Sequence, residues 1–131
     1  IAQFPYPEVP EDFPYQNFNV MQRVNAGPFG PHNLHEPMDG KPWLEQRGDR
    51  VYCCYFHAGL RVYDVSDPYY IKEIAYFIPP NPNKKPEESY FPGFPGPRNA
   101  TTEDCIVDDR GNIIIDALDD GFYILRMKED K

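Results

Sequence analysis

Residues 49–78 have the sequence DRVYCCYFHAGLRVYDVSDPYYIKEIAYFI, and this stretch decides the fold. Short runs rich in Val, Tyr, Phe and Ile alternate in it with turn residues, HAG at 57–59 and SDP at 66–68. β-Branched and aromatic residues favour the pleated surface of a sheet, whereas Gly, Pro and Asp favour turns. The pattern predicts three consecutive antiparallel strands at 49–56, 60–65 and 71–78.

A second group of strand-like segments follows at 104–107, 112–117 and 122–127. VYCCYFHAGLRVYDV (51–65) aligns with IIIDALDDGFYILRM (113–127), which places Gly59 opposite Gly121 and His57 opposite Asp119. Internal repetition in an all-β chain favours propeller blades. A simple β-sandwich is the alternative, but it gives no reason for the repeat.

The predicted fold class is therefore all-β, with about two antiparallel β-propeller blades at 17–78 and 79–131 and a strand at 17–24. Residues 1–16 (IAQFPYPEVPEDFPYQ) are predicted to form an extended arm of Pro and aromatic residues. A blade buries its faces only against neighbours, and repeat folds need about three or more units. The incomplete propeller is expected to be completed by another polypeptide or by self-association, with the arm as a clasp between subunits.

Composition and charge exclude several classes of protein. The formal net charge is −8, and such an acidic surface repels phosphate backbones, so no nucleic-acid partner is expected. No apolar run approaches the roughly 18 residues of a membrane span, and no signal-peptide pattern is present. Cysteines occur at 53, 54 and 105, an odd number without the spacing of a disulfide framework or zinc ribbon. These features predict buried, reduced thiols and a cytoplasmic protein.

Three segments are similar to a known family. GLRVYDVSDPYYIKEIAYF (59–77), GPHNLHEP (30–37) and DDGFYILR (119–126) resemble the C-terminal part of LVIVD-repeat bacterial proteins. The similarity spans residues 17–127, although the second repeat lacks the DVSDP ending. It implies a β-propeller-like fold and indicates little about a reaction.

A polar cluster marks the candidate site. His32, His35 and Glu36 lie in a Pro-bracketed segment at 31–37, where an innermost strand would begin, and the second copy carries Glu103 and Asp104. Imidazole and carboxylate groups bind zinc, iron, manganese or copper. We predict His32 and His35 as metal ligands, Glu36, Glu103 and Asp104 as catalytic carboxylates, and a divalent metal as candidate cofactor. Metal-free acid–base chemistry and simple hydrogen bonding to backbone groups remain as alternatives.

Three functional classes follow from these residues. The first is an enzyme component that shares a metal-dependent or acid–base site with another chain at the propeller channel. The second is a non-catalytic scaffold or interaction subunit. The third is a small-molecule-binding propeller with an aromatic pocket that includes Trp43 or Tyr55. His57 is predicted to be a turn residue that accepts a hydrogen bond from a turn amide, and Cys105 is a weaker nucleophile candidate because no activating base is visible beside it.

Overall fold

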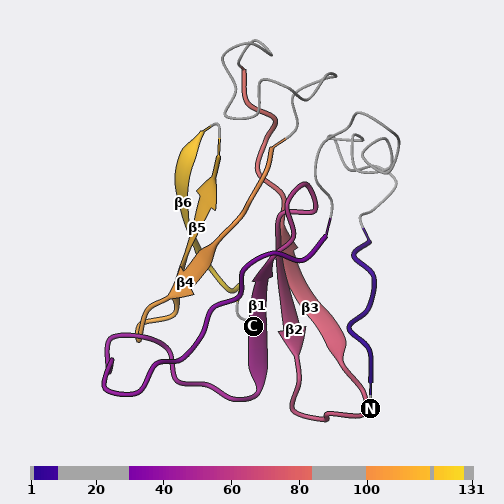
Figure 1. The fold of residues 1–131 in the computed structure, drawn as a ribbon, viewed down its shortest axis with the longest axis vertical. Helices are drawn as coiled ribbons and strands as arrows, with labels where there is room; N and C mark the ends of the chain where they lie inside the picture. Colours follow the sequence, from indigo (N-terminus) through magenta and orange to yellow (C-terminus); the bar gives the residue numbers. More distant parts are fainter. Residues whose placement is uncertain (1, 9–29, 84–99, 119, 129–131) are drawn as a thin grey trace.

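The structure is a computed structural model that describes residues 2–8, 30–83, 100–118 and 120–128. These residues form two three-stranded antiparallel sheets and no helix. Sheet 1 contains β1 (Arg50–Cys54), β2 (Leu60–Asp64) and β3 (Lys72–Phe77), and sheet 2 contains β4 (Cys105–Val107), β5 (Asn112–Ala117) and β6 (Gly121–Arg126) (Figure 1).

The predicted all-β class is confirmed, and each of the six strands lies within two residues of its predicted range. The predicted strand at 17–24 lies outside the described residues. Within the described ranges, no helix is long and apolar enough to cross a membrane.

Aspartates close the turns that separate the strands. After β2, Asp64 Oδ1 accepts a hydrogen bond from the Ser66 amide at 2.9 Å. Between β4 and β5, Asp108 Oδ1 accepts bonds from the amides of Arg110 at 3.0 Å and Asn112 at 2.8 Å. Side-chain acceptors of this kind replace the backbone partners that a turning chain loses.

The core lies between the two sheets. Tyr52, Cys54, Leu60 and Val62 of sheet 1 share one buried cluster with the inner-face residues of sheet 2, which are Cys105, Val107, Ile113 and Ile115. Burial of one aliphatic side chain contributes about 1.5–3 kcal/mol, so this cluster is the main attachment of one sheet to the other.

The far face of sheet 1 is covered by the N-terminal arm. The ring of Phe4 meets Tyr63 edge-on, with centroids 5.0 Å apart. The buried Arg61 donates to the Glu8 carbonyl oxygen at 2.7 Å. Figure 1 shows residues 2–8, in indigo, running beside sheet 1. The described part of the predicted intersubunit clasp therefore packs against its own chain.

A buried ion pair fixes β2 against β3. Arg61 Nη1 lies 3.0 Å from Glu73 Oε1, and its guanidinium carbon lies 4.9 Å from the centroid of the Tyr76 ring. Positions 73 and 76 would face opposite sides of a regular strand, but the register of β2 and β3 shifts between Val62 and Tyr63. The bulge lets both side chains reach the same guanidinium. Burial raises the pKa of the Glu73 carboxyl, and the Arg61 charge opposes that rise.

The internal repeat is visible in the strand registers. Tyr52 pairs with Val62 in sheet 1, and the aligned residues Ile114 and Ile124 pair in sheet 2. All five residue pairs of β1 and β2 correspond in this way to pairs of β5 and β6. Gly59 and Gly121, aligned in sequence, both have positive φ, at 72° and 101°.

The correspondence is offset by one strand. Because β1 matches β5 and β2 matches β6, the counterpart of β4 must lie on the free edge of β1. Leu34 occupies that place: it bridges Cys53 just as Cys105 pairs with Ile115. Both sheets keep the expected strand order, yet β3 has no counterpart among the described residues of sheet 2.

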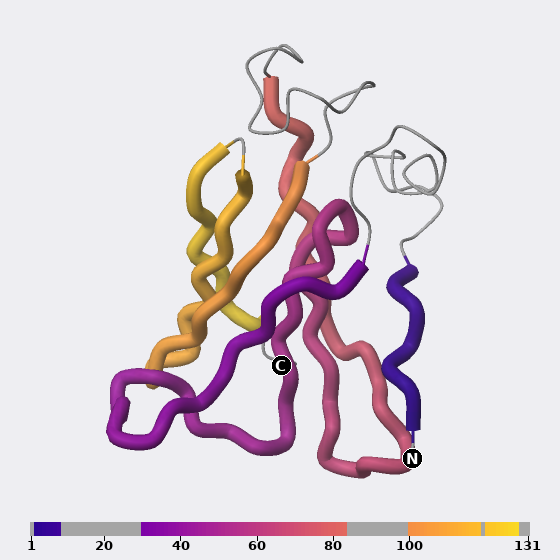
Figure 2. The backbone as a smooth tube through the Cα atoms, in the orientation of Figure 1, coloured from indigo at the N-terminus to yellow at the C-terminus, as the bar shows by residue number. Residues whose placement is uncertain are grey.

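Residues 32–45 join the two sheets along their edges. The amide of His35 donates to the Tyr52 carbonyl on β1 at 3.1 Å, and the amide of Glu45 donates to the Val107 carbonyl on β4 at 2.9 Å. Figure 2 shows this part of the chain, in purple, passing from the first sheet to the second. The segment that carries the predicted site residues is thus held at both ends.

Candidate functional site

A groove of about 720 Å³ opens between residues 32–38 and the outer face of sheet 2. We define this outer face by Ile106, Ile114, Asp116, Phe122 and Ile124, whose positions alternate with the inner, core-facing residues. The groove is lined by residues 32–36, Met38, Leu44, 104–106, 114–116 and Phe122.

The groove brings together four of the five predicted polar site residues. His32, His35, Glu36 and Asp104 all contribute to its lining. The Glu103 side chain does not line the groove. The contact of Glu103 with this segment is made by its backbone carbonyl, which accepts a hydrogen bond from the Asn33 amide at 3.2 Å. The two segments, which the repeat alignment places at equivalent positions, lie side by side in the structure.

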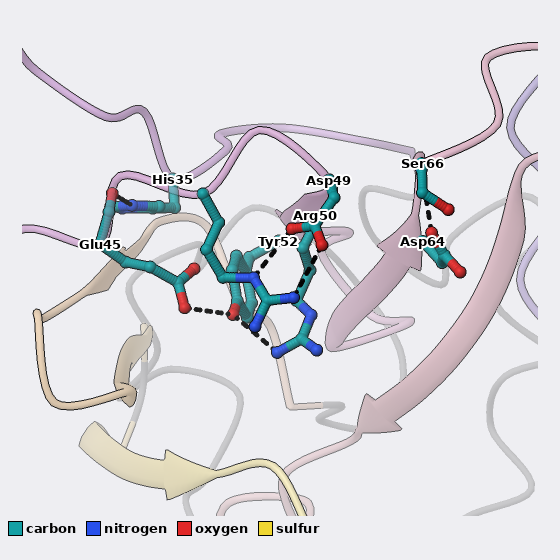
Figure 3. Close-up of polar contacts among 8 residues, drawn as sticks. His35, Glu45, Asp49, Arg50, Tyr52, Asp64 and Ser66 are labelled. Atoms are coloured by element: carbon teal, nitrogen blue, oxygen red, sulfur yellow. Dashed lines mark hydrogen bonds and ion pairs between the residues drawn. The ribbon is translucent and has the colours of Figure 1, made fainter.

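Both ring nitrogens of His35 are engaged. Nε2 donates to the Glu45 carbonyl at 3.0 Å, as Figure 3 shows, and Nδ1 accepts from the Val107 amide at 3.1 Å. One donor and one acceptor correspond to a neutral imidazole with its proton on Nε2. The prediction of His35 as a metal ligand is not supported by this geometry, since no ring lone pair is left for an ion.

In contrast to His35, His32 has a hydrogen-bond partner on only one ring nitrogen among the described residues. Its Nδ1 lies 2.9 Å from the Glu103 carbonyl oxygen, and its ring packs against Phe56 with centroids 4.7 Å apart. This contact uses Nδ1 as the donor and leaves Nε2 as the nitrogen that can act on a ligand. Across the described ranges, no three His, Cys, Asp or Glu side chains lie close enough together to hold a metal ion. The described residues therefore supply no complete metal site.

The acidic side of the groove is organised by Asp116, a residue that was not predicted from the sequence. Its Oδ1 accepts hydrogen bonds from the amides of Glu103 and Asp104, both at 2.8 Å. Asp104 in turn accepts from the Cys105 amide through Oδ1 at 2.8 Å. A signal was present, because Asp116 interrupts the apolar run IIIDAL at the position of Cys54 in the first copy.

A second missed network lies behind His35. The Tyr52 hydroxyl donates to Glu45 Oε1 at 3.1 Å and accepts from Arg50 Nη1 at 3.3 Å (Figure 3). Burial raises the pKa of the Tyr52 phenol above its ordinary value. The network orients Glu45, whose carbonyl holds His35, so it positions the groove wall and does not enter the groove itself.

Neither aromatic residue predicted for ligand binding lines the groove. Trp43 is exposed, with the Lys41 ammonium 5.1 Å from its ring centroid, and its carbonyl accepts from the Asp109 amide at 2.9 Å. Tyr55 lies at the start of the β1–β2 turn, where its amide donates to the Gly59 carbonyl at 2.8 Å. The ligand-binding roles predicted for Trp43 and Tyr55 therefore gain no support from this groove.

The three cysteines are free and buried. Burial raises the pKa of the Cys53 thiol to about 11. Cys105 lines the groove, yet its Sγ donates to the Tyr52 carbonyl at 3.6 Å on the core side. The hydrogen bond with the Cys54 thiol lowers the pKa of Cys105, but the sulfur is held against a backbone carbonyl on the core side, so the geometry gives the nucleophile alternative no support.

His57 lies in the β1–β2 turn, as predicted, with only 4% of its surface exposed. The expected hydrogen bond from a turn amide is absent: Nδ1 is buried and has no partner among the described residues. Burial lowers the pKa of this imidazole to about 4. His57 is not part of the groove lining, and Asp119, its aligned residue, lies outside the described residues.

Comparison with known proteins gives no relative: no protein-family model, no curated protein and no solved structure matches the chain. The chemistry of the groove must therefore be inferred from its own residues. Its floor is apolar, and its polar lining comprises carboxylates, imidazoles and an amide. Among the described residues, neither Lys nor Arg contributes to it. Such a surface suits an apolar partner with neutral or basic groups at its rim.

Proposed function

We propose that the chain is a β-propeller-like interaction subunit of a multi-chain protein, and that the outer face of sheet 2 docks a sheet of another polypeptide. One observation carries the proposal. Leu60 and Phe122 occupy equivalent positions of the repeat, but Leu60 is 2% exposed and Phe122 is 78% exposed. The face that sheet 1 buries against sheet 2 is the face that sheet 2 leaves open.

The open face has the composition of a contact surface. Ile106 pairs with Ile114, which pairs with Ile124, so three isoleucines cross the sheet in one row. Leu34 and Met38 add exposed apolar surface on the opposite wall of the groove. Single exposed apolar residues are common on protein surfaces, whereas contiguous apolar patches of this kind mark interaction sites.

The neighbouring sheet shows what can cover such a face. In sheet 1 the equivalent side chains are covered by the inner face of sheet 2, which presents Ile113, Ile115, Tyr123 and Leu125. Stacking of equivalent units against each other is how repeat folds complete their cores. A partner sheet with the same alternating apolar pattern is therefore the best match for the open face.

The test uses a photo-reactive amino acid at two equally exposed positions. Phe122 and Tyr69 are both 78% exposed, but only Phe122 lies on the outer face of sheet 2. Irradiation of the full chain in its native cells is expected to give one dominant adduct from position 122 and none from position 69. Mass spectrometry of the adduct identifies the partner, which is a second copy if the cross-linked peptides all belong to this chain.

A matched pair of charge substitutions completes the test. Ile106 in β4 is 44% exposed and Ile74 in β3 is 42% exposed. Ile106→Asp is expected to abolish the adduct from position 122, and Ile74→Asp is expected to leave it unchanged. A well-folded 15.3-kDa monomer by light scattering, with equal labelling at 122 and 69, would refute the proposal.

A second candidate function is favoured by the groove itself. His32, Glu36 and Asp104 line a groove that opens beside the docking face, so a docked partner would enclose them. An enclosed imidazole that shares a groove with carboxylates is suited to acid–base chemistry shared by two chains. Unchanged activity of the parent complex after His32→Ala and Glu36→Gln, with no stoichiometric metal by elemental analysis of untagged protein, would remove this candidate.

The family and location are also proposals. The DVSDP turn and the GPHNLHEP and DDGFYILR segments support assignment to the LVIVD-repeat family. Three free, buried cysteines support a reducing compartment such as the cytoplasm.

A further inference from the structure

The edge of sheet 2 differs from the equivalent strand of sheet 1. β2 has strands on both sides, β1 and β3. β6 matches β2 residue for residue but pairs only with β5 among the described residues. The outer edge of β6 therefore presents backbone amide and carbonyl groups at the place where β2 binds a neighbouring strand.

The β2–β3 pair shows which side chains meet at this position. Leu60 is paired with Phe77, Val62 with Ala75 and Asp64 with Lys72. The first two pairs are apolar, and the third joins opposite charges, with Lys72 helping to lower the pKa of Asp64 after the stronger hydrogen bond from Ser66. Cross-strand pairs like these set the register of a sheet.

In β6 the apolar positions are kept and the charge is reversed. Phe122 stands where Leu60 stands, Ile124 where Val62 stands, and Arg126 where Asp64 stands. A strand that pairs with β6 as β3 pairs with β2 would meet two apolar residues and then a cation. Charge complementarity requires an acidic residue opposite Arg126, where β3 carries Lys72.

Within the described ranges, the edge of β6 lacks the usual protection against such pairing. The sequence GFYILR contains no proline and only one charge, at its end, and it pairs with β5 without a register shift. β3, the edge strand of sheet 1, is interrupted by a bulge and carries Lys72 and Glu73. Natural edge strands use charges, prolines and bulges to prevent pairing, so an unprotected edge suits a partner strand.

We propose that β6 accepts an antiparallel strand from a partner polypeptide, with apolar residues opposite Phe122 and Ile124 and a carboxylate opposite Arg126. The inference deepens the proposed function, since both place a partner on sheet 2, but it concerns the strand edge and not the outer face. Main-chain hydrogen bonds would supply the affinity, and the three side-chain positions would supply the specificity.

The test uses two labelled peptides derived from β3. One has the sequence of residues 70–78, YIKEIAYFI, and the other carries Lys72→Glu. Fluorescence anisotropy with the full-length chain is expected to show about tenfold tighter binding of the Glu peptide, because one cross-strand pair changes from repulsion to attraction. Arg126→Glu in the chain is expected to reverse the preference.

Lys41→Glu is the control, because it makes the same change in net charge at an exposed loop residue outside β6. The control should keep the preference for the Glu peptide, and circular dichroism should show that Arg126→Glu remains folded. Equal binding of both peptides, no binding of either, or a preference that Arg126→Glu leaves unreversed would overturn the inference.

The experiments distinguish failure of the docking face of sheet 2 from failure of strand pairing at the β6 edge. Ile106 lies on β4, two strands from the edge of β6, so Ile106→Asp should not alter the peptide preference. Loss of the preference in a chain that still forms the position-122 adduct would remove this inference alone. An intact preference without that adduct would remove the proposed function alone.

Discussion

The β1–β2 pair of sheet 1 and the β5–β6 pair of sheet 2 share one strand register, and the two sheets differ in what covers them. Leu60 and Val62 of sheet 1 are in the core, while Phe122 and Ile124, their equivalents, face outward from sheet 2. Pairing within each sheet depends on local alternation and turns, whereas burial depends on a neighbour. The comparison teaches that two copies of a repeat can have the same strand register and still contribute unequally to the free energy of unfolding.

The largest expected difference is between Leu60→Ala and Phe122→Ala. Leu60→Ala empties a buried site and should lower the free energy of unfolding by about 2–5 kcal/mol. Phe122→Ala removes an exposed ring and should change it by less than about 0.5 kcal/mol. Urea titration of the two variants measures both values, and equal losses would show that the two faces are covered alike in solution.

The second prediction concerns how the free energy of unfolding changes at acidic pH, and it depends on His57 in the β1–β2 turn. The imidazole of His57 has a pKa of about 4 in the folded chain and about 6.5 when unfolded. Between these two pH values the unfolded chain binds more protons than the folded chain. The contribution of His57 to the free energy of unfolding is therefore complete above pH 6.5 and is lost as the pH falls toward 4. The expected loss is about 3 kcal/mol at pH 4.

The matched variant is His57→Asn, which removes the titration from the β1–β2 turn and should remain folded at pH 7. Its free energy of unfolding should fall less steeply than that of the wild type between pH 6.5 and pH 4. Parallel pH profiles of the two proteins would mean that His57 is hydrated and titrates normally.

The smallest difference expected is between two glycine substitutions. Gly59 and Gly121 both have positive φ, so alanine costs about 1–2 kcal/mol at either position. A Cβ at Gly59 would also clash with the Phe77 carbonyl oxygen and the Ile78 Cα, whereas at Gly121 it would meet nothing within 4 Å. Gly59→Ala should therefore be the more destabilising by about 1–3 kcal/mol in thermal or urea unfolding. Equal costs would place β3 farther from this turn.

Much of the fold could be predicted because its signals are local. Runs such as RVYCC and NIIIDA, bounded by Gly and Asp turns, specify strands from their own residues. The one-strand offset of the repeat could not be predicted, since it depends on the bridge between Leu34 and Cys53. The internal packing of residues 2–8 depends in the same way on contacts with Arg61 and Tyr63.

The position of the groove could be predicted from the sequence, but the chemical role of each residue in it could not. The Pro-bracketed histidines and Asp104 of the second copy do line one groove, whereas the Glu103 side chain does not. What each nitrogen does depends on distant groups: the Val107 amide that occupies His35 Nδ1 is 72 residues away in the sequence. Likewise, the break that Asp116 makes in the apolar run IIIDAL marks it as unusual, but its partners, the amides of Glu103 and Asp104, are known only from the fold.

The arm at residues 2–8 has a consequence for how far an assembly can grow. A face that accepts the next equivalent unit is a head-to-tail interface, which extends into a ring or a filament unless something ends it. Here Phe4 and Glu8 occupy the far side of sheet 1 through their contacts with Tyr63 and Arg61. If the open face of sheet 2 docks another sheet as proposed above, such stacking would have to stop at sheet 1, because the arm of the same chain already covers its far face.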